Sequence, residues 1–251
     1  MTKIAVFDSG LGSLSVIKSI QKKIRTEIIY FADQDNFPYG TKSISQLRRI
    51  IQCTIKKLKE RFEPDIIVIG SNTPSLLLGI PTRTKIIGVY PPLRDAVKVT
   101  KTKTIAILAT QSVVKSKELK SYIKNNVSGK IKVIPINISP LIELVESGKF
   151  ISEKTFCKKK VRRILESFLK EPVDVAILSS THLPFLIPML QKTFPRIKFL
   201  DPADMIADQV LAILQIKKSK INKLRIFASG DTKIFQRKLQ RLGIRNNVMQ
   251  L

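Results

Sequence analysis

Short, continuously apolar runs rich in β-branched residues recur along this chain, and each is followed by a stretch with helical periodicity. The run Asp65-Ile66-Ile67-Val68-Ile69-Gly70 is an example, because its apolar residues do not alternate with polar ones. A strand of this kind is buried on both faces, as happens when helices cover both sides of a parallel sheet. We therefore predict strands at residues 3–7, 27–32, 65–70, 85–89, 104–109, 131–136, 173–178, 197–200 and 223–228.

Amphipathic stretches separate the predicted strands. In residues 43–62 the apolar side chains fall at helical spacing with Lys and Arg between them: Leu47, Ile50, Ile51, Ile55, Leu58 and Phe62. Residues 152–169 show the same pattern, through Phe156, Val161, Ile164, Leu165 and Phe168. Alternating strands and helices predict an α/β fold in which right-handed crossovers join parallel strands.

An internal repeat predicts how these strands and helices are divided between two domains. Residues 64–74 align with residues 173–183, which pairs Asp65 with Asp174 and Ser71 with Ser180. The remaining strands of each half align in the same order, and residues 206–251 add a helix, a strand and a helix to the first half. We predict two pseudo-symmetric, doubly wound parallel-sheet domains with the active-site cleft between them. The first comprises residues 1–92 and 207–251, and the second comprises residues 93–206.

The charge of the chain is strongly positive. Its 45 Lys and Arg residues exceed its 19 Asp and Glu residues, giving a formal net charge of +26, and such an excess raises the question of nucleic-acid binding. The densest clusters are residues 158–163 and residues 217–220, and neither contains interleaved aromatic residues or a nucleic-acid-binding motif. We interpret the charge as a solvated, Lys-rich surface that steers small anions, and not as a nucleic-acid interface.

The sequence shows neither a targeting signal nor a cysteine motif. No apolar run approaches the ~18 residues of a membrane span, and Met1-Thr2-Lys3 leads directly into the first predicted strand without a signal-peptide pattern. The two cysteines, Cys53 and Cys157, form neither a metal-binding motif nor a disulfide framework. Each falls in a predicted helix and is expected to be a small buried side chain. The sequence thus predicts a reduced cytoplasmic protein without a metal site.

A glycine-rich turn follows the first predicted strand, at the end where open parallel sheets bind ligands. It reads Asp8-Ser9-Gly10-Leu11-Gly12-Ser13, in which the glycines allow a tight turn and close approach of a ligand to the backbone. Ser9 or Ser13 is a candidate cap for the next helix, and a simple capping turn would have a similar sequence, so both interpretations remain open here. The turn lacks the third glycine and the acidic residue of a dinucleotide-binding fingerprint.

Polar motifs also follow the second and third predicted strands. The loop Asp33-Gln34-Asp35-Asn36-Phe37-Pro38-Tyr39-Gly40 is either a lid or binding loop, or a plain surface turn. Ser71-Asn72-Thr73 follows the third strand, and its counterpart in the repeat, Ser180-Thr181-His182, contains the single histidine of the chain. A lone histidine is often structural. Its place after a buried strand nevertheless favours a role in proton transfer.

In their order and spacing, Asp8-Ser9-Gly10, Phe37-Pro38-Tyr39-Gly40, Ser71-Asn72-Thr73 and Ser180-Thr181-His182 resemble the glutamate racemases of the aspartate/glutamate racemase superfamily. The resemblance covers nearly the whole chain, including Gly88-Val89, Ala109-Thr110 and Ser229-Gly230-Asp231. It implies two α/β domains, an active site between them, no cofactor and a homodimer. It also implies that two cysteines act on the α-carbon of a small acidic amino acid: one thiolate removes the proton and the other thiol delivers a proton to the opposite face.

The resemblance further implies a set of site residues. Asp8 and His182 would assist the acid/base pair, and Glu146, before Ser147-Gly148, takes the position of a supporting glutamate. The residues that would hold the amino acid are Asp8, Ser9, Pro38, Tyr39, Gly40, Asn72, Thr73, Thr110, Thr181 and His182. Val113 stands where the resemblance leads one to expect a threonine.

Serine occupies both positions at which the family carries its catalytic cysteines, Ser71 and Ser180. A cysteine thiol has a reference pKa of about 8.5, whereas a serine hydroxyl is a far weaker acid that needs a positioned base. Two-base racemisation is therefore expected to be slow or absent. Three hypotheses follow: a racemase working through the serines or through His182 and Asp8, a catalytically silent binder of an acidic small molecule, and a Ser–His hydrolase or lyase.

Overall fold

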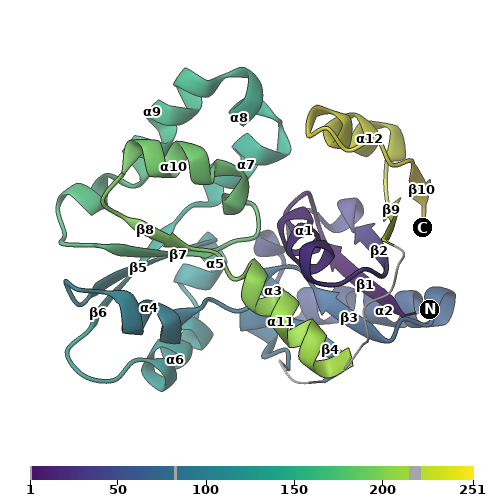
Figure 1. Ribbon diagram of the computed structural model, residues 1–251, viewed down its shortest axis with the longest axis horizontal. Helices are drawn as coiled ribbons and strands as arrows, with labels where there is room; N and C mark the ends of the chain where they lie inside the picture. Colours follow the sequence, from purple (N-terminus) through teal and green to yellow (C-terminus); the bar gives the residue numbers. More distant parts are fainter. Residues whose placement is uncertain (1, 82–83, 215–221) are drawn as a thin grey trace. The chain divides into compact units, whose positions relative to one another are not determined.

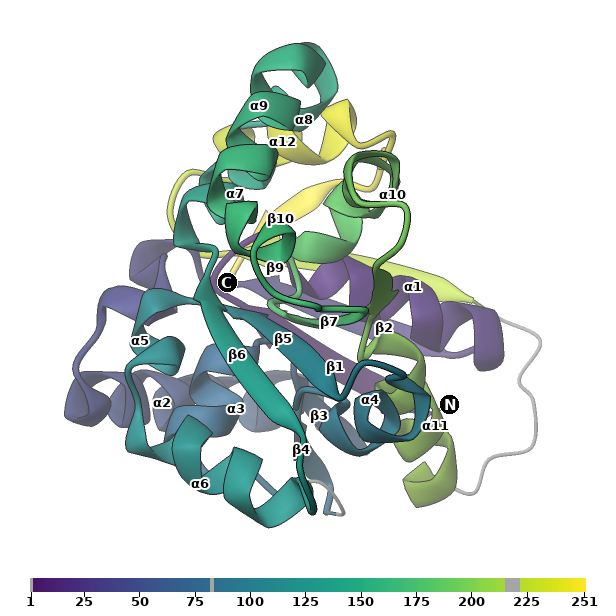
Figure 2. The same cartoon turned by 90° about the vertical axis from the view of Figure 1, so that its left-hand side faces the viewer.

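The computed structural model describes residues 2–81, 84–214 and 222–251. The chain folds into two compact units, Met1–Val89 with Ala203–Leu251, and Tyr90–Pro202. Each unit is a parallel sheet flanked by helices (Figures 1 and 2), which confirms the α/β prediction. The lysine cluster at residues 217–220 lies outside the described residues. In the part of the chain that is described, no helix is long and apolar enough to cross a membrane.

The sheet of the first unit has the strand order β10-β9-β2-β1-β3-β4, and every neighbouring pair is parallel. Its strands are β1 (Lys3–Asp8), β2 (Glu27–Ala32), β3 (Ile66–Ile69), β4 (Ile86–Gly88), β9 (Lys223–Ala228) and β10 (Val248–Gln250). All residues of β2 and β3 are buried, as their continuous apolar runs predict. Strand β10 was not predicted, because its three residues are too few to show periodicity.

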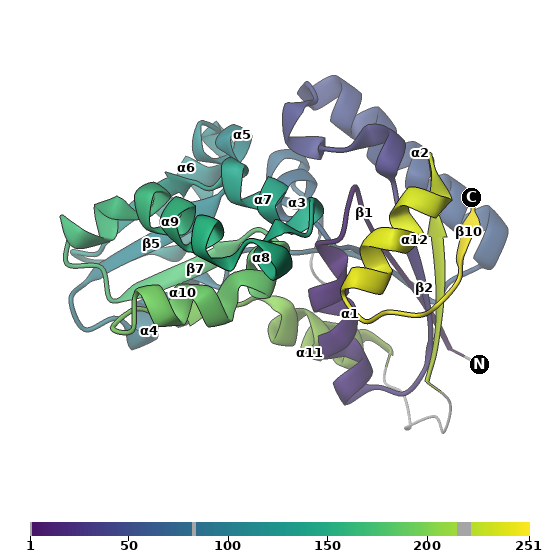
Figure 3. The same cartoon turned by 90° about the horizontal axis from the view of Figure 1, so that it is seen from above.

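Helices cover both faces of this sheet. They are α1 (Ser13–Lys23), α2 (Ile44–Phe62), α3 (Asn72–Leu78), α11 (Ala203–Leu214) and α12 (Thr232–Arg241), with the short 3-10 helices η1 (Gln34–Asn36) and η2 (Tyr39–Thr41). Figure 3 shows α1, α11 and α12 on one face and α2 on the other, and α3 packs against α2. This arrangement follows from right-handed crossovers, because the chain moves along the sheet in opposite directions on the two faces.

The second unit repeats the core topology of the first. Its sheet has the order β6-β5-β7-β8, the same order as β2-β1-β3-β4, and all pairs are parallel. The strands are β5 (Thr104–Ala109), β6 (Lys132–Asn137), β7 (Val175–Ser179) and β8 (Lys198–Leu200). The internal repeat in the sequence therefore corresponds to a repeated four-stranded unit.

Helices cover both faces of the second sheet as well. They are α4 (Leu93–Val99), α5 (Gln111–Val114), α6 (Lys117–Asn126), α7 (Ser139–Glu146), α8 (Lys149–Ser152), α9 (Lys154–Ile164) and α10 (Ile187–Thr193), with η3 (Glu166–Leu169) and η4 (Leu183–Leu186). Figure 2 shows α4, α5 and α6 on one face and α7, α9 and α10 on the other.

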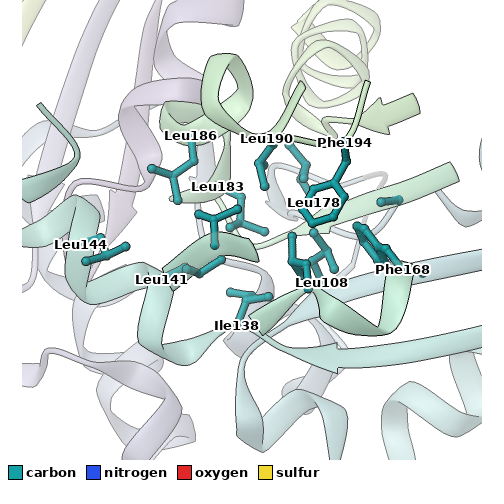
Figure 4. Packing of buried hydrophobic residues seen from close by; sticks show 14 of the residues in the cluster. Leu108, Ile138, Leu141, Leu144, Phe168, Leu178, Leu183, Leu186, Leu190 and Phe194 are labelled. Carbon is teal, nitrogen blue, oxygen red and sulfur yellow. The ribbon is translucent and has the colours of Figure 1, made fainter. Parts of the chain in front are cut away.

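The hydrophobic core of the second unit fixes the segment that follows β7. Leu108 and Leu178 project from the sheet and pack with Leu141 and with Leu183 and Leu186 of η4 (Figure 4). Burying each such leucine stabilises the fold by about 1.5–3 kcal/mol. Because Leu183 directly follows His182, this packing also fixes the backbone of the Ser180-Thr181-His182 motif.

Two predictions about the helical regions need correction, one about the length of a helix and one about the burial of a side chain. The helix expected at residues 152–169 is broken: α9 ends at Ile164, and Phe156 is 49% exposed beside the ammonium of Lys149 and not in the core. Cys53 is exposed, not buried, because the buried stripe of α2 runs through Leu47, Ile51, Thr54, Leu58 and Phe62. Cys157 is buried, as expected.

Asp65 and Asp174, which are equivalent in the repeat, both accept backbone hydrogen bonds at or just before the first strand of their own sheet. Asp65 Oδ2 accepts a hydrogen bond from the backbone N–H of Lys3, at the start of β1. Asp174 accepts bonds from the backbone N–H of Lys101 (2.6 Å) and Thr102 (3.2 Å) and from the hydroxyls of Thr100 and Thr102, just before β5. Burial raises the pKa of Asp174, but these hydrogen bonds outweigh it, and the pKa is lowered overall.

Replacing Asp174 with Asn should lower the free energy of unfolding by about 1–3 kcal/mol at neutral pH, because amide groups cannot accept all four hydrogen bonds. The lowered pKa means that the carboxylate's contribution is complete above its unfolded value of about 3.9 and is lost as the pH falls through the folded value. Urea unfolding of Asp174→Asn and the unaltered protein should therefore converge in acid.

Asp95→Asn is the matched control in the same unit. Asp95 is exposed and pairs with the exposed Lys98, so its replacement should change stability by less than about 0.5 kcal/mol. An equal loss in both variants would contradict the role assigned to Asp174.

Candidate active site

Parallel pairing brings the polar motifs of the first unit to the same end of its sheet. The N–H of Gly70, just after β3, donates to the carbonyl of Phe7 (2.8 Å), and the N–H of Asp33, just after β2, donates to the carbonyl of Asp8 (2.8 Å). The segments beginning at Asp8, Asp33 and Ser71 therefore emerge side by side. This is the end at which open parallel sheets bind ligands.

The glycine-rich turn after β1 does not use a serine cap. Gly12 occupies the N-cap position of α1 and makes no side-chain capping bond. The hydroxyl of Ser13 instead donates to the carbonyl of Gly70 (3.3 Å), and a Cβ on Gly70 would collide with that hydroxyl. The N–H of Ser9 donates to Asp8 Oδ1 (2.7 Å). The proposed capping role of Ser9 or Ser13 is therefore wrong, and the turn instead holds the buried Asp8 carboxylate in place.

Ser71 and Asn72 begin helix α3. The carbonyl of Ser71 accepts a bond from the Ser75 hydroxyl (2.6 Å), which fixes its backbone. Among the described residues, the Ser71 hydroxyl has no hydrogen-bond partner and does not cap α3. The Asn72 amide nitrogen donates to the carbonyl of Val89 (3.2 Å), while its buried Oδ1 accepts nothing from the described residues. A donor on a ligand would relieve the cost of leaving this oxygen unpaired.

The loop at residues 33–40 is anchored and is not a plain surface turn. The Tyr39 side chain is 2% exposed, and its hydroxyl donates to Asp33 Oδ2 (3.0 Å). Burial, and then the charges of Asp33 and Asp8, raise the pKa of Tyr39 well above its usual value, so the phenol remains a donor. Helix η2, which begins at Tyr39, packs against α3.

The second unit places its motifs in the same way. Ala109 at the end of β5 pairs with Ser179 at the end of β7, so Thr110 and Ser180 leave the sheet side by side. The Thr110 hydroxyl lies 3.2 Å from that of Ser112. Ser180 is 6% exposed, and its hydroxyl has no hydrogen-bond partner within the described part of the chain. Val113, which replaces the expected threonine, is fully buried.

The single histidine forms a buried pair with Glu146. His182 Nε2 lies 2.8 Å from Glu146 Oε1, and both side chains are almost completely buried. Glu146 is the last residue of α7, and His182 precedes η4. With Glu146 ionised, its carboxylate accepts only and Nε2 is the donor; in either protonation state the contact holds the ring in one orientation. His182 is not hydrogen-bonded to Ser180, so the described structure shows no activated Ser–His pair in this unit.

Neither cysteine lies at these strand ends. Cys53 is on the exposed side of α2, and Cys157 is in the core of the second unit. Burial, and then the charge of Glu153, raise the pKa of the Cys157 thiol, so it stays protonated. No group of three or more His, Cys, Asp or Glu side chains within residues 2–81, 84–214 and 222–251 is arranged to hold a metal.

Asp33 and Ser229 belong to motifs noted in the sequence, but neither residue was assigned to the site from the sequence. The hydroxyl of Ser229 donates to Asp33 Oδ1 (3.3 Å). Asp33 had a usable signal, because it follows β2 just as Asp8 terminates β1. Ser229 belongs to a motif of the resemblance, but no local pattern predicts its contact with Asp33, because that contact depends on the pairing of β2 with β9, which are distant in the sequence.

The His182–Glu146 pair predicts a single imidazole tautomer. Because the chain has one histidine, its ring nitrogens give unambiguous two-bond ¹H–¹⁵N NMR signals. We expect the Nε2-protonated form in the unaltered protein and averaging of the two tautomers in Glu146→Ala. Glu143→Ala, on the exposed side of the same helix, should leave the spectrum unchanged. Averaged signals in the unaltered protein would contradict the pairing.

Comparison with known proteins places the chain in a family. No protein-family model matches it. A glutamate racemase from Buchnera aphidicola subsp. Schizaphis graminum is 32% identical over 229 residues, covering 87% of this chain and 88% of the relative. A glutamate racemase structure from Bacillus anthracis is 26% identical, with a TM-score of 0.86 over 100% of this chain and 97% of the other. The Escherichia coli glutamate racemase, solved with L-glutamate and an activator, shares the fold at 24% identity, with a TM-score of 0.85 over 100% and 98% of the two chains. By its identity to the Buchnera enzyme across most of both chains, this protein belongs to the glutamate racemase family.

Proposed function

We propose that this chain is an isomerase that moves the α-proton of an acidic amino acid without a cofactor, through Ser71 and Ser180. One observation carries the proposal. Each unit holds, at the carboxyl end of its central strands, a serine hydroxyl that bonds no described residue, and an ionisable group fixed by hydrogen bonds stands at the same end of that sheet. That group is Asp8 in the first unit and the Glu146–His182 pair in the second.

Inverting an α-carbon requires a base on one face and an acid on the other. In the proposed reaction, the Ser71 oxygen takes the α-proton while its own hydroxyl proton passes to the Asp8 carboxylate. Ser180 then delivers its proton to the opposite face of the carbanion, and a proton from solvent, relayed past the ring of His182, restores the Ser180 hydroxyl. The reverse sequence serves the other enantiomer. Because neither hydroxyl is a good acid or base near neutral pH, we expect turnover far below that of a thiol pair.

The substrate groups match the remaining polar atoms. The buried, unpaired Oδ1 of Asn72 suits the α-ammonium of an amino acid. The hydroxyls of Ser9, Thr73, Thr110 and Thr181, with the Pro38-Tyr39-Gly40 segment, form the rest of the proposed binding set. The net charge of +26 favours the approach of an anion. The Escherichia coli enzyme of the same fold was solved with L-glutamate, which makes glutamate the first ligand to test.

The alternatives lack a supporting observation of this kind. A Ser–His hydrolase needs a nucleophile bonded to its base, and the described structure shows no such bond between His182 and Ser180. A silent binder would take up the same ligand without exchanging its proton. Proton exchange therefore separates binding from catalysis.

The unaltered protein should exchange the α-proton of both glutamate enantiomers for deuterium in D₂O, slowly enough to be followed by ¹H NMR over hours. Ser71→Ala or Ser180→Ala should abolish exchange, because each removes one of the two proton carriers. Glutamate binding without exchange would support the silent binder, and no binding would refute the proposed ligand set.

Restoring thiols should accelerate the reaction. We expect Ser71→Cys/Ser180→Cys to raise the exchange rate by at least about tenfold, because a thiol is much closer to the pKa of a useful acid or base. Cys53→Ser is the matched control and should change nothing, since this exposed thiol lies on α2. An unchanged rate in the double variant, with glutamate still bound, would refute proton transfer at these two positions.

A further inference from the structure

The Ser229-Gly230-Asp231 motif attaches the C-terminal segment to the loop after β2. Ser229 follows β9, and its N–H donates to the carbonyl of Ala32 (3.0 Å). Its hydroxyl donates to Asp33 Oδ1 (3.3 Å) and accepts from the N–H of Asp35 (3.1 Å). The side chain of Ser229 thus joins Asp33, which precedes η1, to Asp35 in the middle of η1.

The other two residues of the motif allow this contact. Gly230 has a φ of +70°, and a Cβ there would lie 2.9 Å from Asp35 Oδ1, so only glycine permits this close approach without strain. Asp231 accepts a bond from the N–H of Ile234 (2.9 Å) and caps α12. The motif therefore sets where α12 begins and how closely the C-terminal turn approaches the loop.

Asp33 is the acceptor on which these contacts converge. Its carboxylate is 3% exposed and receives bonds from the Tyr39 hydroxyl (3.0 Å), the Asn36 amide (2.9 and 3.0 Å) and the Ser229 hydroxyl. Burying a carboxylate is expensive unless such bonds compensate, so the arrangement is tightly specified. Of these donors, Tyr39 is the one that belongs to η2.

Helix η2 connects this carboxylate to the candidate site. It packs against α3, whose N-cap is Ser71 and whose first residue is Asn72. The Tyr39 hydroxyl donates its proton to Asp33, so towards a ligand it can act only as an acceptor unless this bond breaks, and the Tyr39–Gly40 segment otherwise offers its ring and main chain.

We propose that Asp33 is a positioning residue: braced by Ser229 from the C-terminal segment, it holds Tyr39 and the Tyr39–Gly40 segment against the start of α3 in the geometry that binds the amino acid. This inference rests on the proposed function, because it assumes that glutamate occupies this site. It assigns a role to the terminal motif, which otherwise takes no part in the reaction.

A double-mutant cycle on glutamate affinity tests the proposal. Asp33→Asn and Tyr39→Phe should each weaken binding by roughly tenfold, the usual loss for a charge-assisted hydrogen bond. The double variant should bind no more weakly than the weaker-binding single variant, because both changes remove the same contact. Additive losses would show that Asp33 acts by another route and would overturn the proposal.

A second readout follows the geometry without requiring activity. With tyrosine labelled at Cζ, the ¹³C signal that Tyr39→Phe removes identifies Tyr39 among the four tyrosines. That signal should shift in Asp33→Asn and not in Asp174→Asn, a control that loses a comparable hydrogen-bonded carboxylate in the second unit. Asp174→Asn should lower the melting temperature and leave glutamate affinity unchanged.

The outcomes separate this inference from the proposed function. If the unaltered protein binds glutamate and Asp33→Asn shifts the Tyr39 signal without weakening binding, the inference alone is overturned. If the unaltered protein binds no glutamate, both the inference about Asp33 and the proposed function are refuted. Should Asp33→Asn fail to fold, Tyr39→Phe decides, because it removes a single hydroxyl: weaker binding supports the inference, and unchanged affinity overturns it.

Discussion

Parallel strand pairing is the constraint on which the rest of this structure depends. Hydrogen bonds along β1 with β2 and β3, and along β5 with β6 and β7, bring the carboxyl ends of neighbouring strands to one end of each sheet. Residues distant in the sequence become neighbours there without any side-chain interaction. The side chains then need only satisfy the polar groups that this arrangement buries, as Asp33 and Glu146 do.

Much of the fold was predictable because strands buried on both faces leave a continuous apolar signal. The nine predicted strands all form, with boundaries within about two residues, and the repeat predicted their shared order. Strand β10 and the exposure of Cys53 were not predictable in this way, since a three-residue strand has no period and Cys53 adjoins a buried stripe. The contacts of Asp33 with Ser229 depend on the register of β2 and β9, which no local pattern encodes.

The candidate site combines side chains fixed by hydrogen bonds with two proposed proton carriers whose hydroxyls are weak acids and bases. The Asp8 carboxylate is held by the Ser9 amide, and the His182 ring is held by Glu146. The two groups proposed to touch the α-carbon, Ser71 and Ser180, are hydroxyls that no described neighbour activates. In this proposal the two sets of residues affect different quantities. The side chains fixed by hydrogen bonds set the affinity for the ligand, and the acidity of the Ser71 and Ser180 hydroxyls sets the rate of proton transfer.

This separation is the central claim, and calorimetric titration of glutamate measures it most directly. The unaltered protein and Ser71→Cys/Ser180→Cys should bind glutamate with dissociation constants equal within about threefold, because oxygen and sulfur differ little as ligand contacts but greatly as acids. A much tighter complex in the double variant would contradict the claim, since it would show that serine at these positions impairs the binding site itself. Absence of binding in both proteins would contradict it equally.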